Sequence, residues 1–213
     1  MGIEKEIKEL DGQILEMAGQ VEKNLSYAID VYLNYDELKK YQEVDDKKVN
    51  MQERMIEKDC LHLMLKERLF SEDLRQVTGI MSMVQDLERL GDHAKDILEF
   101  ALRLKNPFRR DNRIYDLTQH VYSMVERSIQ SYLKRDVSMA KQVILDDDYV
   151  DQEYSSIIQE LIDKENKGEI TSSYAIYSAL VVKYLERIGD HATNVAEWAI
   201  YILTGYYKDL QII

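Results

Sequence analysis

The sequence predicts an all-α protein made of two tandem three-helix bundles that are related by an internal repeat. One proline and eight glycines occur in 213 residues, whereas sheet proteins need many tight turns rich in both. The octapeptide LERLGDHA at residues 87–94 returns as LERIGDHA at residues 185–192, 98 residues later and identical at seven of eight positions. Apolar residues also recur at helical spacing in both halves, which indicates amphipathic helices. A hydrophobic content of 45% can fill a core at this length and excludes disorder as the main state.

A second repeated segment and the only proline define the expected domain boundary. The segment DDKKVN at residues 45–50 matches DDDYVD at residues 146–151, so the repeat spans about a hundred residues and is domain-sized. Pro107 lies midway along the chain, and proline disfavours helix at its own position and at the residue before it. We therefore predict a first bundle over residues 1–106 and a second over residues 107–213.

Each half is expected to contain three antiparallel helices that close into a bundle. The first helix is predicted by a stripe of apolar residues with seven-residue spacing, which consists of Ile7, Ile14, Val21 and Ala28 beside Leu10, Met17 and Val31. Its counterpart is predicted by Ile114, Val121 and Ser128 beside Leu117, Met124 and Ser131. The middle helices are expected at residues 46–68 and 147–165, and the helices that carry the octapeptide at residues 72–105 and 170–204.

The charge balance and the termini exclude several classes of function. A formal net charge of −12 opposes binding to a phosphate backbone, so we expect no nucleic-acid partner. The N-terminus MGIEKEIKELDGQ lacks the basic start and the apolar stretch of a signal peptide, and no run is long and apolar enough to span a bilayer. Cys60 is the only cysteine and is expected to be a buried core thiol. These features predict a cytoplasmic protein.

Paired carboxylates are the most distinctive chemical feature of the repeat. Each octapeptide places a glutamate and an aspartate four residues apart, as Glu88 with Asp92 and Glu186 with Asp190. Such pairs project from one helix face, where like charges destabilise an isolated helix. The upstream segment of the second half adds Asp147 and Asp151 at the same spacing. Two such pairs on neighbouring helices would present four carboxylates to a hard cation such as iron(III), manganese, magnesium or calcium.

A structural alternative explains the same acids as surface salt bridges, which are common and individually weak. The cations that would neutralise the pairs are Arg89, Arg187, Lys95 and Lys183. The histidines that follow the octapeptide aspartates, His93 and His191, are turned by about 100° from the carboxylates. We therefore expect these two histidines to pack or to hydrogen-bond to a neighbour, and we treat His62 and His120 as ordinary residues.

Gly91 and Gly189 lie in the middle of the predicted octapeptide helices. A glycine there costs about 1 kcal/mol of helix stability relative to alanine. Its recurrence in both copies indicates that another helix approaches closely, or that room is left for an ion.

The doubled LERxGDHA octapeptide, each copy preceded by a DxxVD-like segment, resembles the PhoU family of phosphate-transport accessory proteins. The resemblance covers essentially the whole chain. It implies two three-helix bundles related by a pseudo-twofold axis, with multinuclear metal clusters held by (E/D)xxxD pairs. Iron would be the first choice of metal, with manganese or magnesium as alternatives.

The family's ligand positions can be assigned residue by residue. The second bundle is complete, and its matching residues are Asp147, Asp151, Glu186 and Asp190. In the first bundle the matching residues are Asp46, Glu88 and Asp92, while Asn50 stands where the second bundle has Asp151. One hypothesis is that Asp96, four residues after Asp92, replaces the missing carboxylate.

The resemblance also implies a function. The protein would be a regulatory adapter that restrains the high-affinity phosphate transporter and the phosphate-sensing kinase pathway when phosphate is sufficient. Expected partners are the ATPase subunit of the phosphate ABC transporter and a sensor histidine kinase, with contact to the membrane only through partners. A homodimer is also expected, and catalysis is not.

Two other functions stay open at this point. One is a metal-free helical scaffold that assists a phosphate carrier. The other is a ferritin-like di-iron enzyme, although its ExxH spacing is absent because Glu88 and Glu186 are each followed three residues later by glycine. No serine, cysteine or histidine constellation for nucleophilic catalysis stands out, and there is no glycine-rich phosphate loop.

Overall fold

The structure is a computed structural model. It describes residues 3–42, 44, 46–66, 69–105, 111–208 and 210–211. Pro107 and the predicted boundary between residues 106 and 107 lie outside the described residues, so the division into two domains stays a prediction.

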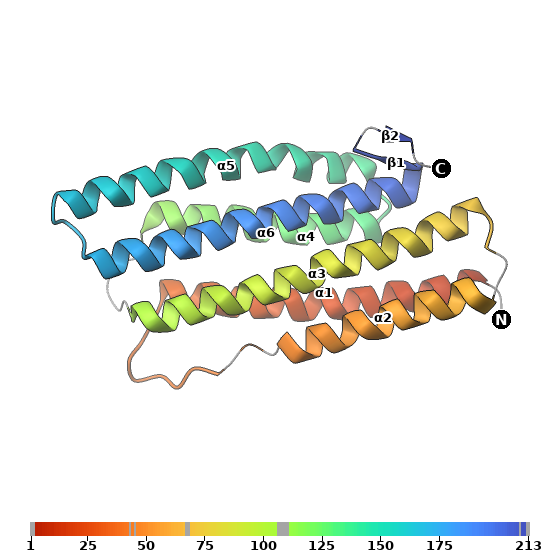
Figure 1. Cartoon of the computed structure of the whole chain (residues 1–213), viewed down its shortest axis with the longest axis horizontal. Coiled ribbons are helices and arrows are strands. Elements are labelled where there is room, and N and C mark those ends of the chain that lie inside the picture. The colour runs from red at the N-terminus through yellow and green to blue at the C-terminus, as the bar shows by residue number, and fades with distance from the viewer. Residues whose placement is uncertain are drawn as a thin grey trace.

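The described residues form six helices and one short antiparallel ribbon (Figure 1). The helices are α1 (Ile3–Leu33), α2 (Asp46–Lys66), α3 (Ser71–Leu104), α4 (Asn112–Leu133), α5 (Val137–Asn166) and α6 (Ser172–Thr204). The ribbon pairs β1 (Tyr206–Tyr207) with β2 (Leu210–Gln211). The predicted all-α fold class is confirmed. None of the helices in the described ranges has an apolar stretch long enough to cross a membrane.

Two elements differ from the prediction. Helix α5 begins at Val137 instead of near residue 147. The Asp136 side chain is its N-cap, because it accepts a hydrogen bond from the backbone N–H of Met139, which has no partner within the helix. The β1–β2 ribbon was not predicted. It follows Gly205, whose φ of 84° ends α6 in the left-handed conformation that glycine adopts without a steric penalty.

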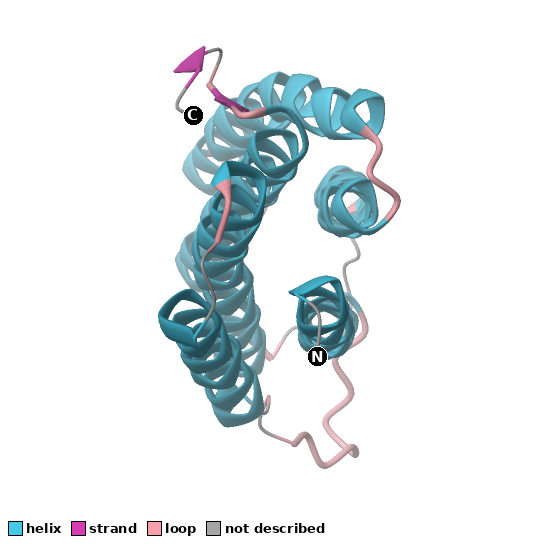
Figure 2. Ribbon diagram, turned by 90° about the vertical axis from the view of Figure 1, so that its right-hand side faces the viewer, coloured by secondary structure: helices cyan, strands magenta, loops and turns pink. Residues whose placement is uncertain are grey.

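Helices α3 and α6, which carry the octapeptides, pack against each other and join the two halves. Each half is a three-helix unit in which α1, α2 and α3 contact one another, as do α4, α5 and α6. Figure 2 shows α1 and α4 on one side of a row formed by α5, α6, α3 and α2. The octapeptides therefore lie at the centre of the molecule, and α2 and α5 lie at its two edges.

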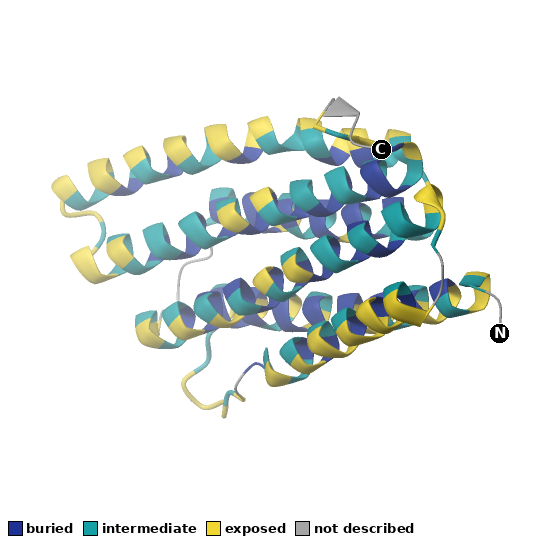
Figure 3. Ribbon diagram, turned by 45° about the vertical axis from the view of Figure 1, so that its right-hand side comes forward, coloured by how far each residue is buried: buried dark blue, intermediate teal, exposed yellow. Residues whose placement is uncertain are grey.

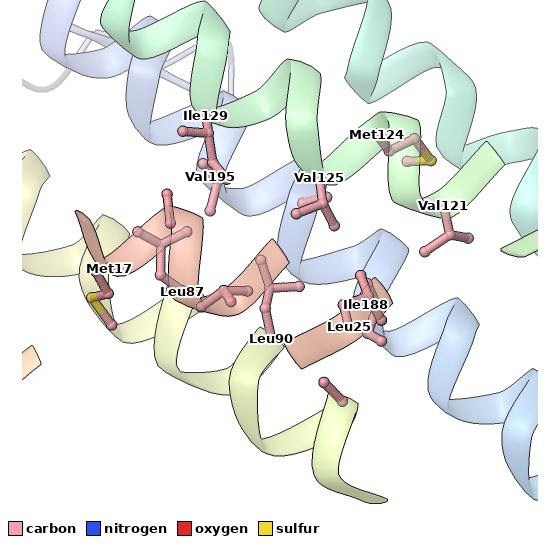
Figure 4. Packing of buried hydrophobic residues seen from close by; sticks show 14 of the residues in the cluster. Met17, Leu25, Leu87, Leu90, Val121, Met124, Val125, Ile129, Ile188 and Val195 are labelled. Carbon is pink, nitrogen blue, oxygen red and sulfur yellow. The ribbon is translucent and has the colours of Figure 1, made fainter. Parts of the chain in front are cut away.

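One apolar core runs through both halves. Ile14, Met17 and Val21 of the predicted α1 stripe are fully buried, as are Val121 and Met124 of α4, so the predicted stripes are confirmed. Figure 4 shows apolar side chains of the two halves close together, and Figure 3 shows that the exposed faces of α2 and α5 point outward.

Two further expectations about small residues are confirmed. Cys60 is fully buried, and burial raises the pKa of its thiol to about 12. Gly91 and Gly189 mark close helix approaches, since a Cβ atom at Gly91 would lie 3.1 Å from Val49 of α2 and one at Gly189 would lie 3.3 Å from Val150 of α5. The two valines are repeat equivalents, so both halves use the same crossing.

Candidate metal centres

The α5–α6 crossing brings together the four carboxylates that were assigned to the second bundle. Asp147 and Asp151 lie on α5, and Glu186 and Asp190 lie on α6. Burial raises the pKa of Asp147 to about 6, and the negative charges of Asp190, Asp151 and Glu186 add to this rise. Burial, followed by Glu186 and Asp151, also raises the pKa of Asp190. The four acids therefore share one electrostatic environment, in which full ionisation without a cation is unfavourable.

One oxygen at this crossing has no partner. Oδ1 of Asp147 is buried and makes no hydrogen bond, which is a costly state for a carboxylate oxygen. A Cβ atom at Gly189 would lie 3.5 Å from the same oxygen, so the glycine leaves space beside it. An unsatisfied carboxylate oxygen among three further acids is a donor set that suits a hard cation.

The structure also shows a protein cation at this crossing. The Lys183 ammonium donates to both carboxylate oxygens of Glu186, at 2.7 and 2.6 Å. Arg187 instead lies over the ring of Tyr184, with its guanidinium carbon 5.3 Å from the ring centroid. The salt-bridge alternative assigned Lys183 and Arg187 to the acids of this crossing. Among the described residues, only Lys183 forms an ion pair with them.

The α2–α3 crossing brings together Asp46, Glu88 and Asp92. Burial, and then the charges of Asp92 and Asp46, raise the pKa of Glu88. The Lys95 ammonium donates to Asp46 at 2.7 Å and lowers the pKa of that carboxyl. Arg89 lies 3.7 Å from Glu88 and 3.9 Å from Asp92, so cations of the chain compensate part of this cluster.

The position that lacks a carboxylate in the first bundle holds an unsatisfied amide. Oδ1 of Asn50 is buried without a hydrogen-bond partner. The hypothesis that Asp96 replaces the missing acid stays a prediction. Burial, followed by the charges of Asp92 and Glu99, raises the pKa of Asp96, and its carboxylate lies 3.7 Å from Nδ1 of His93. The repeat equivalent of Asp96 is Asn194, which donates across the α3–α6 contact to Asp86 at 3.1 Å.

As the side chains lie, no group of three or more His, Cys, Asp or Glu residues among the described ranges is arranged to hold a metal ion. The residues nevertheless fit a hard cation in their chemistry. Both crossings combine clustered oxygen donors with a buried oxygen that lacks a partner, on Asp147 in one and on Asn50 in the other. Binding would require side-chain rearrangement, including displacement of Lys183 from Glu186.

Sequence reasoning missed an interaction between the two crossings, which is centred on Asp86. Its carboxylate lies 2.8 Å from Nδ1 of His191, and it accepts hydrogen bonds from Asn194 and, at 3.0 Å, from the indole N–H of Trp198. His93 is buried beside His191, with ring centroids 5.3 Å apart, and burial lowers its pKa to about 4. The expectation that the octapeptide histidines pack or hydrogen-bond is confirmed.

Comparison with known proteins gives consistent results for the whole chain. The family model described as PhoU domain matches twice, at residues 14–101 and 114–199. A phosphate-specific transport system accessory protein PhoU homolog of Clostridium acetobutylicum is 33% identical over 97% of this chain and 96% of its own length. The PhoU protein of Escherichia coli is 30% identical over 94% of this chain and 84% of its own length.

The fold comparison agrees with the sequence comparison. The crystal structure of PhoU from Pseudomonas aeruginosa superposes with a TM-score of 0.88 at 27% identity and covers 96% of this chain and 100% of that chain. The two family matches contain both carboxylate crossings. The chain belongs to the PhoU family.

Proposed function

We propose that this protein is a cytoplasmic regulatory adapter of phosphate transport, without catalytic activity of its own, that binds hard metal ions at its two carboxylate crossings. The observation that carries the proposal is the full-length match to proteins named as phosphate-specific transport accessory proteins, combined with carboxylate clusters at equivalent crossings in both repeats. The chemistry of the donors favours iron(III), manganese or magnesium.

In the α5–α6 site, Asp147, Asp151, Glu186 and Asp190 would hold the metal. A bound cation would supply the positive charge that these acids lack. Because Asp147 and Asp151 belong to α5 and the other two acids to α6, binding there would link the two helices and stabilise the folded state by mass action. Asp46, Glu88 and Asp92 would play the same part between α2 and α3.

The proposed partners are the ATPase subunit of the phosphate ABC transporter and the phosphate-responsive sensor histidine kinase. The adapter would restrain both when phosphate is sufficient, and it would act as a homodimer. Support comes from the family membership and from the relatives, which are named as accessory proteins of the phosphate-specific transport system.

Elemental analysis tests the metal part of the proposal. Wild-type protein and a Glu186→Gln, Asp190→Asn double variant are refilled with iron or manganese, beside an Asp163→Asn, Glu165→Gln control that removes the same charge at the far end of α5. We expect stoichiometric metal in the wild type and the control, with a large loss in the double variant. Equal, near-zero metal in all three would contradict metal binding.

A genetic and a binding experiment test the regulatory part. Deletion of the gene in its host should raise phosphate uptake under phosphate-replete conditions, and immobilised protein should retain the host's transporter ATPase subunit. Unchanged uptake together with no retention of the ATPase subunit or of the kinase's cytoplasmic region would contradict the adapter role.

The ion pairs of the crossings favour one alternative, a metal-free scaffold. Lys183 bonds Glu186 and Lys95 bonds Asp46, so part of the acidic charge is already compensated. Near-zero metal combined with a retained ATPase subunit would support this alternative.

A further inference from the structure

We propose that Glu53 supplies the carboxylate that the α2–α3 site lacks at Asn50, so that the donor set of this site is Asp46, Glu53, Glu88 and Asp92. The inference rests on the proposed metal binding and deepens it, because it gives the two sites different ligands.

The first argument is the register of α2. Asp46, Asn50 and Glu53 are spaced four and three residues apart, which places them on successive turns of one helix face. In α5 the equivalent positions hold Asp147, Asp151 and Tyr154. The first bundle therefore loses an acid at the middle position of this face and gains one at the next turn.

The second argument is location. Glu53 and Glu88 line the same pocket, which has a volume of about 450 Å³ and is also lined by Arg89 and Asp86. Glu53 is half-buried, and burial followed by the charge of Glu88 raises its pKa. The Glu53 carboxylate therefore lies in the same pocket as Glu88, which is one of the three acids assigned to the site.

The third argument is a paired exchange between the repeats. In the second bundle, Lys183 bonds Glu186 and lies over the ring of Tyr154, with its Nζ atom 5.0 Å from the ring centroid. In the first bundle the equivalent of Lys183 is Gln85, which carries no charge and donates to Glu57 at 3.2 Å. Where the second bundle has a cation over an aromatic ring, the first has a neutral amide beside an added carboxylate.

The same pocket contains a convenient reporter. Trp198 lines it together with Glu53 and Glu88 and is the only tryptophan of the chain. A paramagnetic ion bound at the α2–α3 site should therefore quench tryptophan fluorescence. Asp92→Asn should remove the quenching, and the Glu186→Gln, Asp190→Asn variant should retain it.

The experiment is a titration of the full chain with MnCl₂, followed by tryptophan fluorescence and by the amount of bound manganese after desalting. We expect Glu53→Gln to weaken manganese binding at the quenching site by at least about tenfold, the effect typical of losing a group that supports a metal site. The matched control is Asp59→Asn, which removes an acid of α2 that accepts a hydrogen bond from Gln13 of α1 at 2.8 Å. This control should titrate like the wild type.

A rescue variant separates missing charge from a disturbed fold. Asn50→Asp, added to Glu53→Gln, should restore tight binding by moving the acid back to the position that it has in the second bundle. Circular dichroism confirms that each variant is folded. If Glu53→Gln loses manganese binding and the added Asn50→Asp does not restore it, the assignment is overturned. The loss would then come from a disturbed helix face and not from the missing charge.

The remaining outcomes separate this inference from the proposed function. If the wild type binds manganese and Asp92→Asn abolishes the quenching while Glu53→Gln has no effect, the role of Glu53 is refuted and metal binding stands. A wild type that takes up no manganese would refute both.

Discussion

Asp86 and Trp198 come from different copies of the repeat, and the indole N–H of Trp198 donates to the Asp86 carboxylate at 3.0 Å. The repeat equivalent of Asp86 is Tyr184, which faces His93 and Phe100 with ring-centroid distances of 5.2 and 5.4 Å. Asp86 and Tyr184 thus occupy equivalent positions of the repeat at the α3–α6 contact. Asp86 accepts hydrogen bonds there, whereas Tyr184 packs against aromatic rings.

We expect Asp86→Asn to lower the free energy of unfolding by about 1–3 kcal/mol. The asparagine amide keeps one acceptor oxygen but places an NH₂ group where the other carboxylate oxygen was, so either Trp198 or Asn194 would lose its acceptor. Urea unfolding measures the change, and Glu37→Gln in the exposed α1–α2 connection is the control. Equal stability of Asp86→Asn and the control would contradict the role of this contact.

Gly79→Ala should destabilise the α3–α6 contact by about 1–3 kcal/mol. A Cβ atom there would overlap the side chain of Ile202, which is buried and has little space to move. Gly12→Ala in α1 should instead stabilise the protein by up to about 1 kcal/mol, because Gly12 has no atom within contact range of an added Cβ. Thermal or urea unfolding measures the change in stability of both variants, which should have opposite signs. Equal changes in stability would contradict the tight contact at Gly79.

Asp147→Asn should have opposite effects with and without metal. The folded-state pKa of about 6 lies above the usual aspartate value, so the folded state binds more protons than the unfolded state. The stabilising effect of this group is therefore lost as the pH rises through about 6. At pH 7.5 with chelator, the variant should be more stable than the wild type by about 1 kcal/mol after allowance for solvent screening. With manganese, only the wild type should gain stability.

The measurement for Asp147→Asn is urea unfolding at pH 5 and 7.5, with and without manganese. The advantage of the metal-free variant should shrink at pH 5, where the wild-type carboxyl is largely protonated. The same stability difference at both pH values would contradict a raised pKa.

Lys183→Gln should tighten manganese binding at the α5–α6 site about two- to fivefold, since a partly exposed ion pair that competes with metal contributes up to about 1 kcal/mol. Calorimetric titration in an Asp92→Asn background isolates this site. Lys167→Gln, at the end of α5, serves as the control. Weaker binding in Lys183→Gln would indicate that the ammonium orients Glu186 for the metal and does not compete with it.

The sequence was sufficient for features that depend on periodicity along one helix. The buried α1 stripe through Ile14 and Val21 and the glycine crossings at Gly91 and Gly189 follow from spacing and repetition alone. The start of α5 was predicted too late because the repeated acidic segment begins only at residue 146, whereas the helix begins at the Asp136 cap and already buries Ala140 and Val143.

The contacts between the halves could not be predicted from spacing. Asp86 is one acid among many in the sequence, and only the packing of α3 on α6 shows that His191, Asn194 and Trp198 surround it. Asp96 shares the spacing of Asp92, but the spacing does not show that its carboxylate also lies 3.7 Å from Nδ1 of His93. Pairing between helices depends on rotation about the helix axis, which a four-residue interval specifies only approximately.

The exchange of Asp86 for Tyr184 has a consequence for how the two halves can associate. If two identical first halves were to associate through α3, each Asp86 would meet Asp96 and Phe100, an acceptor and a ring without a polar hydrogen, in place of the amide of Asn194 and the indole of Trp198. Two identical second halves would bury those donors against tyrosine. At this contact the two halves are therefore complementary, not interchangeable.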